Sequence, residues 1–174
     1  AQLESRVINA RLEQVAALTD GYRNLVSEAL AGNINAPEVE TAQTTDSGVT
    51  YSPQDSGGSA FFYSGATPPA SQDTAKIRRM ATLDPVMREL QHSNPLIASV
   101  YFNSWDSYNH IYPWFDTSEQ YPHDMVIPEF NFYYLADAEH NPSRGVVWTD
   151  VYLDPAGQGW MMSAIAPVYR GDFL

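Results

Sequence analysis

The feature that most constrains this chain is a short Pro- and Gly-containing segment between two β-rich runs. The runs, Val146 to Asp154 and Trp160 to Tyr169, are rich in Val, Trp, Tyr and Ile, which favour strands. The segment between them, Pro155-Ala156-Gly157-Gln158-Gly159, has the composition of a tight turn. We therefore predict a β-hairpin over Val146 to Tyr169.

The strongest helix signal lies at the other end of the sequence, from Leu3 to Leu30. The apolar residues that recur every seven positions there are Ile8, Val15, Tyr22 and Ala29. Gly32 and Asn33 supply a stop signal. Two interpretations stay open: a helix lying on its own domain, or a stalk whose apolar seam also meets a second copy. We expect a homodimer formed through this helix.

The region between these two features divides into a polar part and a structured part. Residues 33–73 are rich in Thr, Ser, Gly, Pro and Asp, and we predict a long polar connection that is either packed on the domain or partly disordered, with one anchored point at Phe61 to Tyr63. Residues 74–91 have helical spacing that Asp84-Pro85 interrupts, which predicts two short helices with Pro85 first in the second helix and Asp84 or Thr82 as its cap.

Two further strands are predicted before the hairpin. Leu96 to Phe102 favours a strand, and Asn103 to Asn109 favours a polar turn. His110 to Phe115 favours a return strand, in which Pro113 indicates either a strand at the edge of the sheet or the end of the strand. The sum is an α+β fold, with a long N-terminal helix and a mostly antiparallel sheet of about five strands with flanking helices. We divide the chain into a helix (1–32), a connection (33–73) and a main module (74–174).

Composition excludes several classes of function. A formal net charge of −12 with a single lysine, Lys76, argues against binding to nucleic acid or to an anionic membrane surface. The sequence has no cysteine, its four histidines lack metal-ligand spacing, and motifs for nucleotide loops, serine nucleophiles and zinc proteases are missing. We therefore predict no catalytic residues, no metal and no cofactor.

Three segments, in order, carry a resemblance to a known family. FYYLA, then WTDVYLD, then WMMSAIAPVYRG after the turn resemble the membrane-distal module of the double Cache (PDC) family. These PAS-like extracytoplasmic sensors of bacterial receptors precede a histidine kinase, a chemotaxis signalling domain or a cyclic-di-GMP enzyme. The resemblance covers about Leu83 to Leu174. It implies a PAS-like fold cut from a longer, membrane-anchored protein, with Ala1 just outside the membrane on the periplasmic or extracellular side.

The resemblance also suggests binding residues. Amino-acid-sensing Cache domains carry an Arg, one residue, then Trp-Tyr, and later Tyr-x-Asp. Here Phe132-Tyr133 and Tyr152-Leu153-Asp154 stand at those positions, but Phe130 replaces the Arg that would hold a carboxylate. A small cationic or neutral ligand, first of all an amine, therefore fits better than an amino acid. Trp105 and Tyr108 are the candidates for the opposite wall.

Structural interpretations stand beside these assignments. Asp154, which precedes Pro155, could simply start a turn. We expect Trp148 and Trp160 to have structural roles. We predict a small-molecule-sensing domain without catalysis of its own, with a histidine kinase as the first expectation for the output. The alternatives are a dimerisation module that binds nothing and a carbohydrate-active enzyme with a carboxylate pair in an aromatic cleft.

Overall fold

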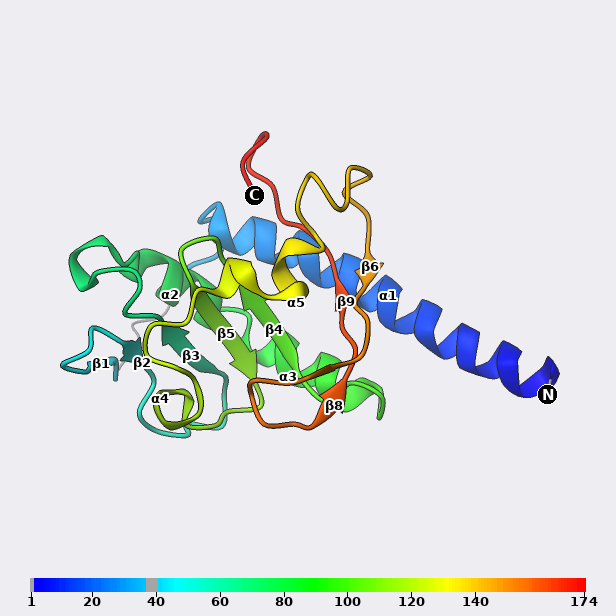
Figure 1. Ribbon diagram of the computed structural model, residues 1–174, viewed down its shortest axis with the longest axis horizontal. Coiled ribbons are helices and arrows are strands. Elements are labelled where there is room, and N and C mark those ends of the chain that lie inside the picture. Colours follow the sequence, from blue (N-terminus) through cyan, green and yellow to red (C-terminus); the bar gives the residue numbers. More distant parts are fainter. Residues whose placement is uncertain (1, 37–40) are drawn as a thin grey trace.

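A long helix runs along one side of the molecule in the computed structural model, which describes residues 2–36 and 41–174. This helix, α1 (Gln2–Leu30), confirms the predicted one, and its N-terminal part projects beyond the rest of the fold (Figure 1). Gly32, just after the end of α1, has a φ of +79°, a left-handed backbone conformation that residues with a Cβ rarely adopt. Tyr22, Val26 and Ala29 are buried, so the C-terminal half of α1 lies on its own domain.

An antiparallel five-stranded sheet forms the centre of the fold, with the order β1-β2-β3-β5-β4. Its strands are β1 (Gln43–Thr44), β2 (Thr50–Tyr51), β3 (Ala60–Tyr63), β4 (Val100–Asn103) and β5 (Tyr108–Tyr112). Three of them lie in residues 33–73, where we predicted only a connection, so that prediction is wrong. β1 and β2 are too short to show a period, and all four residues of β3 are buried, which removes the alternation of a half-buried strand.

Two helices lie between β3 and β4 in the sequence, with the predicted break between them. They are α2 (Thr74–Ala81) and α3 (Asp84–Ser93). The predicted cap is wrong, because α3 begins after Leu83 without a side-chain cap and Pro85 is its second residue. The Asp84 carboxylate is instead used across the fold: Oδ1 lies 2.8 Å from His110 Nε2, and Oδ2 accepts a bond from the Ser59 N–H.

The sheet separates two hydrophobic cores. On one face Tyr63, Tyr108 and Val100 pack against α1, α2 and α3. On the other face Phe62 and Ile111 pack against the segment that follows β5. That segment contains α4 (Thr117–Gln120), η2 (Ile127–Glu129) and α5 (Asn131–Tyr134); the short turn η1 (Pro69–Ser71) precedes α2. Strand alternation thus decides which side chains reach which core.

The predicted hairpin is confirmed, but it forms its own ladders. β7 (Tyr152–Leu153) pairs with β8 (Trp160–Met161), and β6 (Val147–Trp148) pairs with β9 (Ala164–Ile165). Both pairs are two-stranded and neither belongs to the central sheet, so the expectation of one sheet that includes the hairpin is wrong. In Figure 1 the hairpin lies beside β4, the edge strand.

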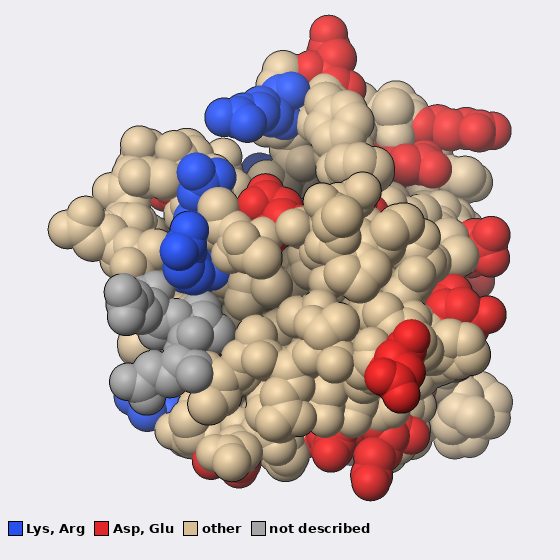
Figure 2. Space-filling model, turned by 90° about the vertical axis from the view of Figure 1, so that its left-hand side faces the viewer, with Lys and Arg blue, Asp and Glu red and all other residues tan. Residues whose placement is uncertain are grey.

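The surface reflects the acidic composition. On the face at the β1–β2 end, shown in Figure 2, Lys and Arg side chains lie mainly at the left, and Asp and Glu side chains lie mainly at the right and along the lower edge. Within the described residues, none of the helices combines the length and hydropathy needed to cross a bilayer.

Candidate ligand-binding site

A small cavity lies on the sheet face opposite α1, α2 and α3. The polar and aromatic residues of its wall are Ser99, Tyr101, Asn103, Asn109, Tyr121, Phe132, Tyr152 and Asp154. Its volume of about 20 Å³ holds roughly one water-sized group. The cavity is therefore a place for a single polar or charged head group among aromatic rings.

The two oxygens of Asp154 differ in their surroundings. Oδ1 accepts a hydrogen bond from the Ala156 N–H at 3.1 Å, so the turn role considered for this residue is present. Oδ2 is buried and has no hydrogen-bond partner. Burial raises the pKa of the Asp154 carboxyl, and the backbone N–H groups of Ala156 and Gln158 only partly oppose this. A carboxylate in this position gains from a cation or donor placed beside Oδ2.

Two tyrosines surround this carboxylate with apolar rings and hydroxyl groups. The Tyr152 hydroxyl is hydrogen-bonded to Ser163 Oγ at 2.7 Å. The buried Tyr101 hydroxyl makes no hydrogen bond of normal geometry, but it lies beside Tyr152 and Ser163. Burial, and then the neighbouring Tyr152, raises the pKa of Tyr101 well above its usual value. Both hydroxyls therefore stay protonated, and each can donate a hydrogen bond to a bound group or accept one from it.

A chain of amides completes the wall on the β4–β5 side. Asn109 Nδ2 donates to Asn103 Oδ1 at 2.8 Å, and the Tyr121 hydroxyl donates to Asn109 Oδ1 at 3.4 Å. Sequence reasoning missed Tyr101, Asn103, Asn109 and Tyr121. The available signal was an asparagine at a core-facing position of a strand, because a buried amide requires partners.

The structure brings together three of the predicted binding residues, Phe132, Tyr152 and Asp154. The Phe132 ring stands 5.6 Å from that of Tyr152 and 6.2 Å from that of Tyr101, centroid to centroid. Tyr133 lies nearby but lines the larger groove described below.

The predicted opposite wall, Trp105 and Tyr108, does not line this cavity. Tyr108 belongs to β5 rather than to the turn, and it points into the core on the other face, where its hydroxyl lies 2.8 Å from His110 Nδ1. The next residue, Asn109, reaches the cavity instead, since successive strand residues face opposite sides. Trp105 is 57% exposed and contacts Phe173.

A buried ion pair holds the turn that carries Trp105. Lys76 Nζ lies 2.5 and 2.7 Å from the two oxygens of Asp106, and Ser104 and Tyr63 also donate to that carboxylate. Burial alone would raise the pKa of Asp106, but these hydrogen bonds outweigh burial and lower it. The single lysine is therefore used inside the fold, where it fixes the β4–β5 turn.

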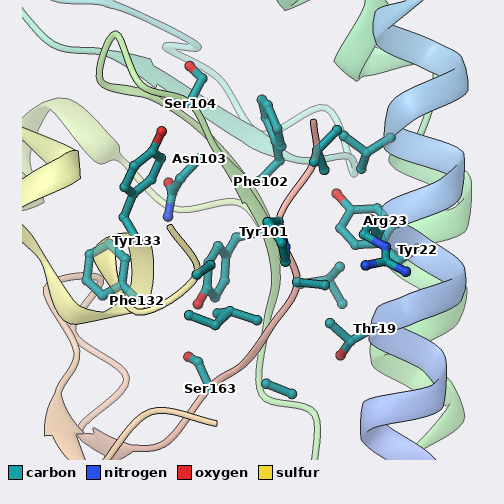
Figure 3. Close-up of a pocket in the computed structure, with 18 of the residues that line it drawn as sticks. Thr19, Tyr22, Arg23, Tyr101, Phe102, Asn103, Ser104, Phe132, Tyr133 and Ser163 are labelled. Carbon is teal, nitrogen blue, oxygen red and sulfur yellow. The ribbon is translucent and has the colours of Figure 1, made fainter. Parts of the chain in front are cut away.

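A groove of about 720 Å³ adjoins the small cavity. Figure 3 shows residues of α1, β4, α5 and the hairpin around it. Both hollows share part of their walls, namely Ser99, Tyr101, Asn103, Phe132 and Met161. The small cavity thus lies at one side of a much larger opening.

The carboxylates of the two hollows bear on the enzyme alternative. Asp154 is the one acidic residue that lines the small cavity, and Asp73 is the one that lines the groove, among the residues described. A glycosidase of the common type needs two facing carboxylates. Across residues 2–36 and 41–174, no three His, Asp or Glu side chains are grouped so that they could hold a metal ion.

The chain matches no protein-family model, no curated protein and no solved structure. Its function is therefore inferred from the cavity and from the residues that the sequence singled out.

Proposed function

We propose that this chain is the extracytoplasmic sensing domain of a bacterial transmembrane receptor of the double Cache type, and that it binds a small amine. The α+β fold, with a long N-terminal helix beside an antiparallel sheet, supports this proposal together with the sequence resemblance. The observation that carries the ligand class is the buried, unpartnered Oδ2 of Asp154 inside an aromatic wall.

An ammonium group satisfies the requirements of this cavity. It supplies the charge that a desolvated carboxylate lacks, and its N–H groups can donate to Asp154 Oδ2 and to the Tyr101 hydroxyl oxygen. The rings of Phe132 and Tyr152 add cation–π attraction of about 0.5–2 kcal/mol each. A carboxylate ligand would be repelled by the charge of Asp154, and none of the described residues that line the small cavity is a lysine or arginine that could offset this charge.

The hairpin contacts both the cavity and α1. Its β7 end carries Tyr152 and Asp154, and its β9 strand packs against α1. A ligand that draws Asp154 inward would therefore favour one position of the hairpin and one position of the helix. In a dimer joined through α1, this bias would change the arrangement of the two helices.

A thermal-shift screen tests the ligand class. The probes are methylamine, ethanolamine and putrescine, with ethylene glycol and acetate as neutral and anionic counterparts. At a concentration one hundred times the dissociation constant, an amine should stabilise the fold by about 2.7 kcal/mol, which raises Tm by roughly 5–10 °C for a domain of this size.

Two variants make this screen specific. Asp154→Asn removes the charge but keeps the shape, and the shift with amines should vanish. Asp150→Asn, at an exposed carboxylate four residues away, should leave the shift unchanged. A shift that survives in Asp154→Asn would refute the cation site; no shift with any probe would favour the dimerisation module.

A further inference from the structure

The groove beside the small cavity is bordered by two strand edges with unused backbone groups. One is the outer edge of β4, the last strand of the central sheet. The other belongs to the extended segment Trp160 to Ala166 of the hairpin. No backbone hydrogen bond joins residues 96–103 to residues 158–170, both of which the structure describes in full.

The hydrogen-bond alternation identifies the free groups on β4. The Ser104 N–H donates to the Tyr108 carbonyl, which makes this opposed pair a hydrogen-bonded one. Hydrogen-bonded pairs alternate along an antiparallel ladder, so Phe102 and Val100 also direct their backbone groups toward β5. Tyr101 and Asn103 therefore direct their N–H and C=O groups outward, into the groove that they line.

The same reasoning applies to the hairpin. The Thr149 N–H donates to the Ser163 carbonyl, so Ser163 and Ile165 turn toward β6. Met162, Ala164 and Ala166 then face the other way, and all three line the groove. Two edges of complementary backbone groups thus border one opening.

The remaining walls of the groove are largely apolar. On the helix side Leu12, Val15 and Val26 of α1 contribute, and on the other side Phe132 and Ala136 do. The β4 edge has none of the usual protection against strand pairing, since Val100 to Asn103 includes no charge and no proline. This combination of free edges and apolar faces fits a strand that is buried on both sides.

We propose that the groove is an acceptor site for one extended peptide strand, about six residues and 20 Å long, with apolar side chains on both faces. The strand would pair with β4 and with Trp160 to Ala166 at once, and it would join the hairpin to the central sheet. Beyond the end of this segment, Phe173 pairs antiparallel with Arg170, and Phe173 and Leu174 line the groove.

Amide hydrogen exchange tests this proposal. The probe is the peptide acetyl-Lys-Val-Ala-Val-Ala-Val-Lys-amide, and the control is the same peptide with N-methyl groups on alternate residues, which removes donors but keeps side chains and charge. The probe should slow exchange of the outward amides of Tyr101, Asn103, Met162 and Ala164 by at least about tenfold. The inward amides of Phe102 and Ile165, already bonded, serve as internal references.

A variant of the protein gives a second control. Ala164→Pro removes a donor that points into the groove and leaves the β6–β9 bonds intact, so it should weaken binding of the probe while the fold persists. Equal binding of the methylated peptide, or saturation without protection of the outward amides, would overturn the proposal. Protection of those amides in a dimer without peptide would overturn it too, because a second copy would then be the occupant.

Discussion

At the scale of single residues, the Asp154 carboxylate combines a structural bond with an unsatisfied oxygen. Oδ1 fixes the turn through Ala156, while Oδ2 is buried without a hydrogen-bond partner in a residue that lines the cavity. The elevated pKa of this carboxyl means that the folded protein holds its proton more tightly than the unfolded chain does. Ionisation of Asp154 therefore opposes folding in the absence of a ligand.

The Asp154→Asn variant should reveal this effect in the pH dependence of stability. Because the folded pKa exceeds the usual 3.8, the wild type is favoured below that value and loses stability as pH rises through the interval up to the folded pKa. The loss in free energy of unfolding is about 1.4 kcal/mol for each unit by which the folded pKa exceeds the unfolded pKa. The variant lacks this loss, so the difference in free energy of unfolding, wild type minus variant, should become more negative with rising pH.

Urea unfolding between pH 3.5 and 7 measures this difference. The other carboxylates are present in both proteins, so their contributions cancel in the difference. Asp150→Asn, at an exposed position, is the matched control for the loss of one carboxylate. A difference for Asp154→Asn that grows more positive with pH would mean that the carboxylate is stabilised in the fold, contrary to its unpartnered Oδ2.

At the scale of elements, α1 has two halves with different surroundings. Leu3, Val7 and Ile8 are 74%, 47% and 57% exposed, whereas Val26 is 1% exposed and belongs to the core with Met80. Tertiary packing therefore anchors the C-terminal half, and the N-terminal half depends on helix propensity or on a partner.

Two valines on this helix provide a matched pair. Val26→Ala should lower the free energy of unfolding by about 2 kcal/mol, because it removes buried methyl groups and leaves a cavity. Val7→Ala makes the same chemical change at an exposed site and should alter stability by less than about 0.5 kcal/mol. Urea unfolding of the two variants checks this, and equal effects would show that α1 does not pack as described.

At the scale of the whole molecule, the exposed apolar residues of α1 bear on assembly. We expect a two-fold symmetric dimer through the N-terminal half of this helix, as the sequence analysis predicted. Each copy carries a net charge of −12, so added salt should favour association by screening the repulsion.

Sedimentation of an Ile8→Glu variant tests the dimer. Since a symmetric interface contains each substitution twice, the dissociation constant should rise at least about a hundredfold. Gln14→Glu adds the same charge at another exposed position of α1 and should have a much smaller effect. A wild-type protein that sediments as a monomer at every concentration and salt level would refute the dimer.

The sequence by itself determined those features that local chemistry controls. Seven-residue spacing and Gly32 set α1 and its end, Asp84-Pro85 divided the two middle helices, and the residues from Pro155 to Gly159 set the hairpin turn. Each of these depends on backbone preferences over a few neighbours, which the sequence displays directly.

Only the tertiary structure decided which residues meet. β3 is buried on both faces and shows no period, so its place at the centre of the sheet was hidden. The predicted return strand began at His110, whereas β5 begins at Tyr108, so Tyr108 was placed in the turn. Asn109 lines the cavity and Tyr108 does not, because strand neighbours face opposite sides. The asymmetry of Asp154, with one oxygen bonded and the other buried alone, arises from packing between segments far apart in sequence, and no local pattern encodes it.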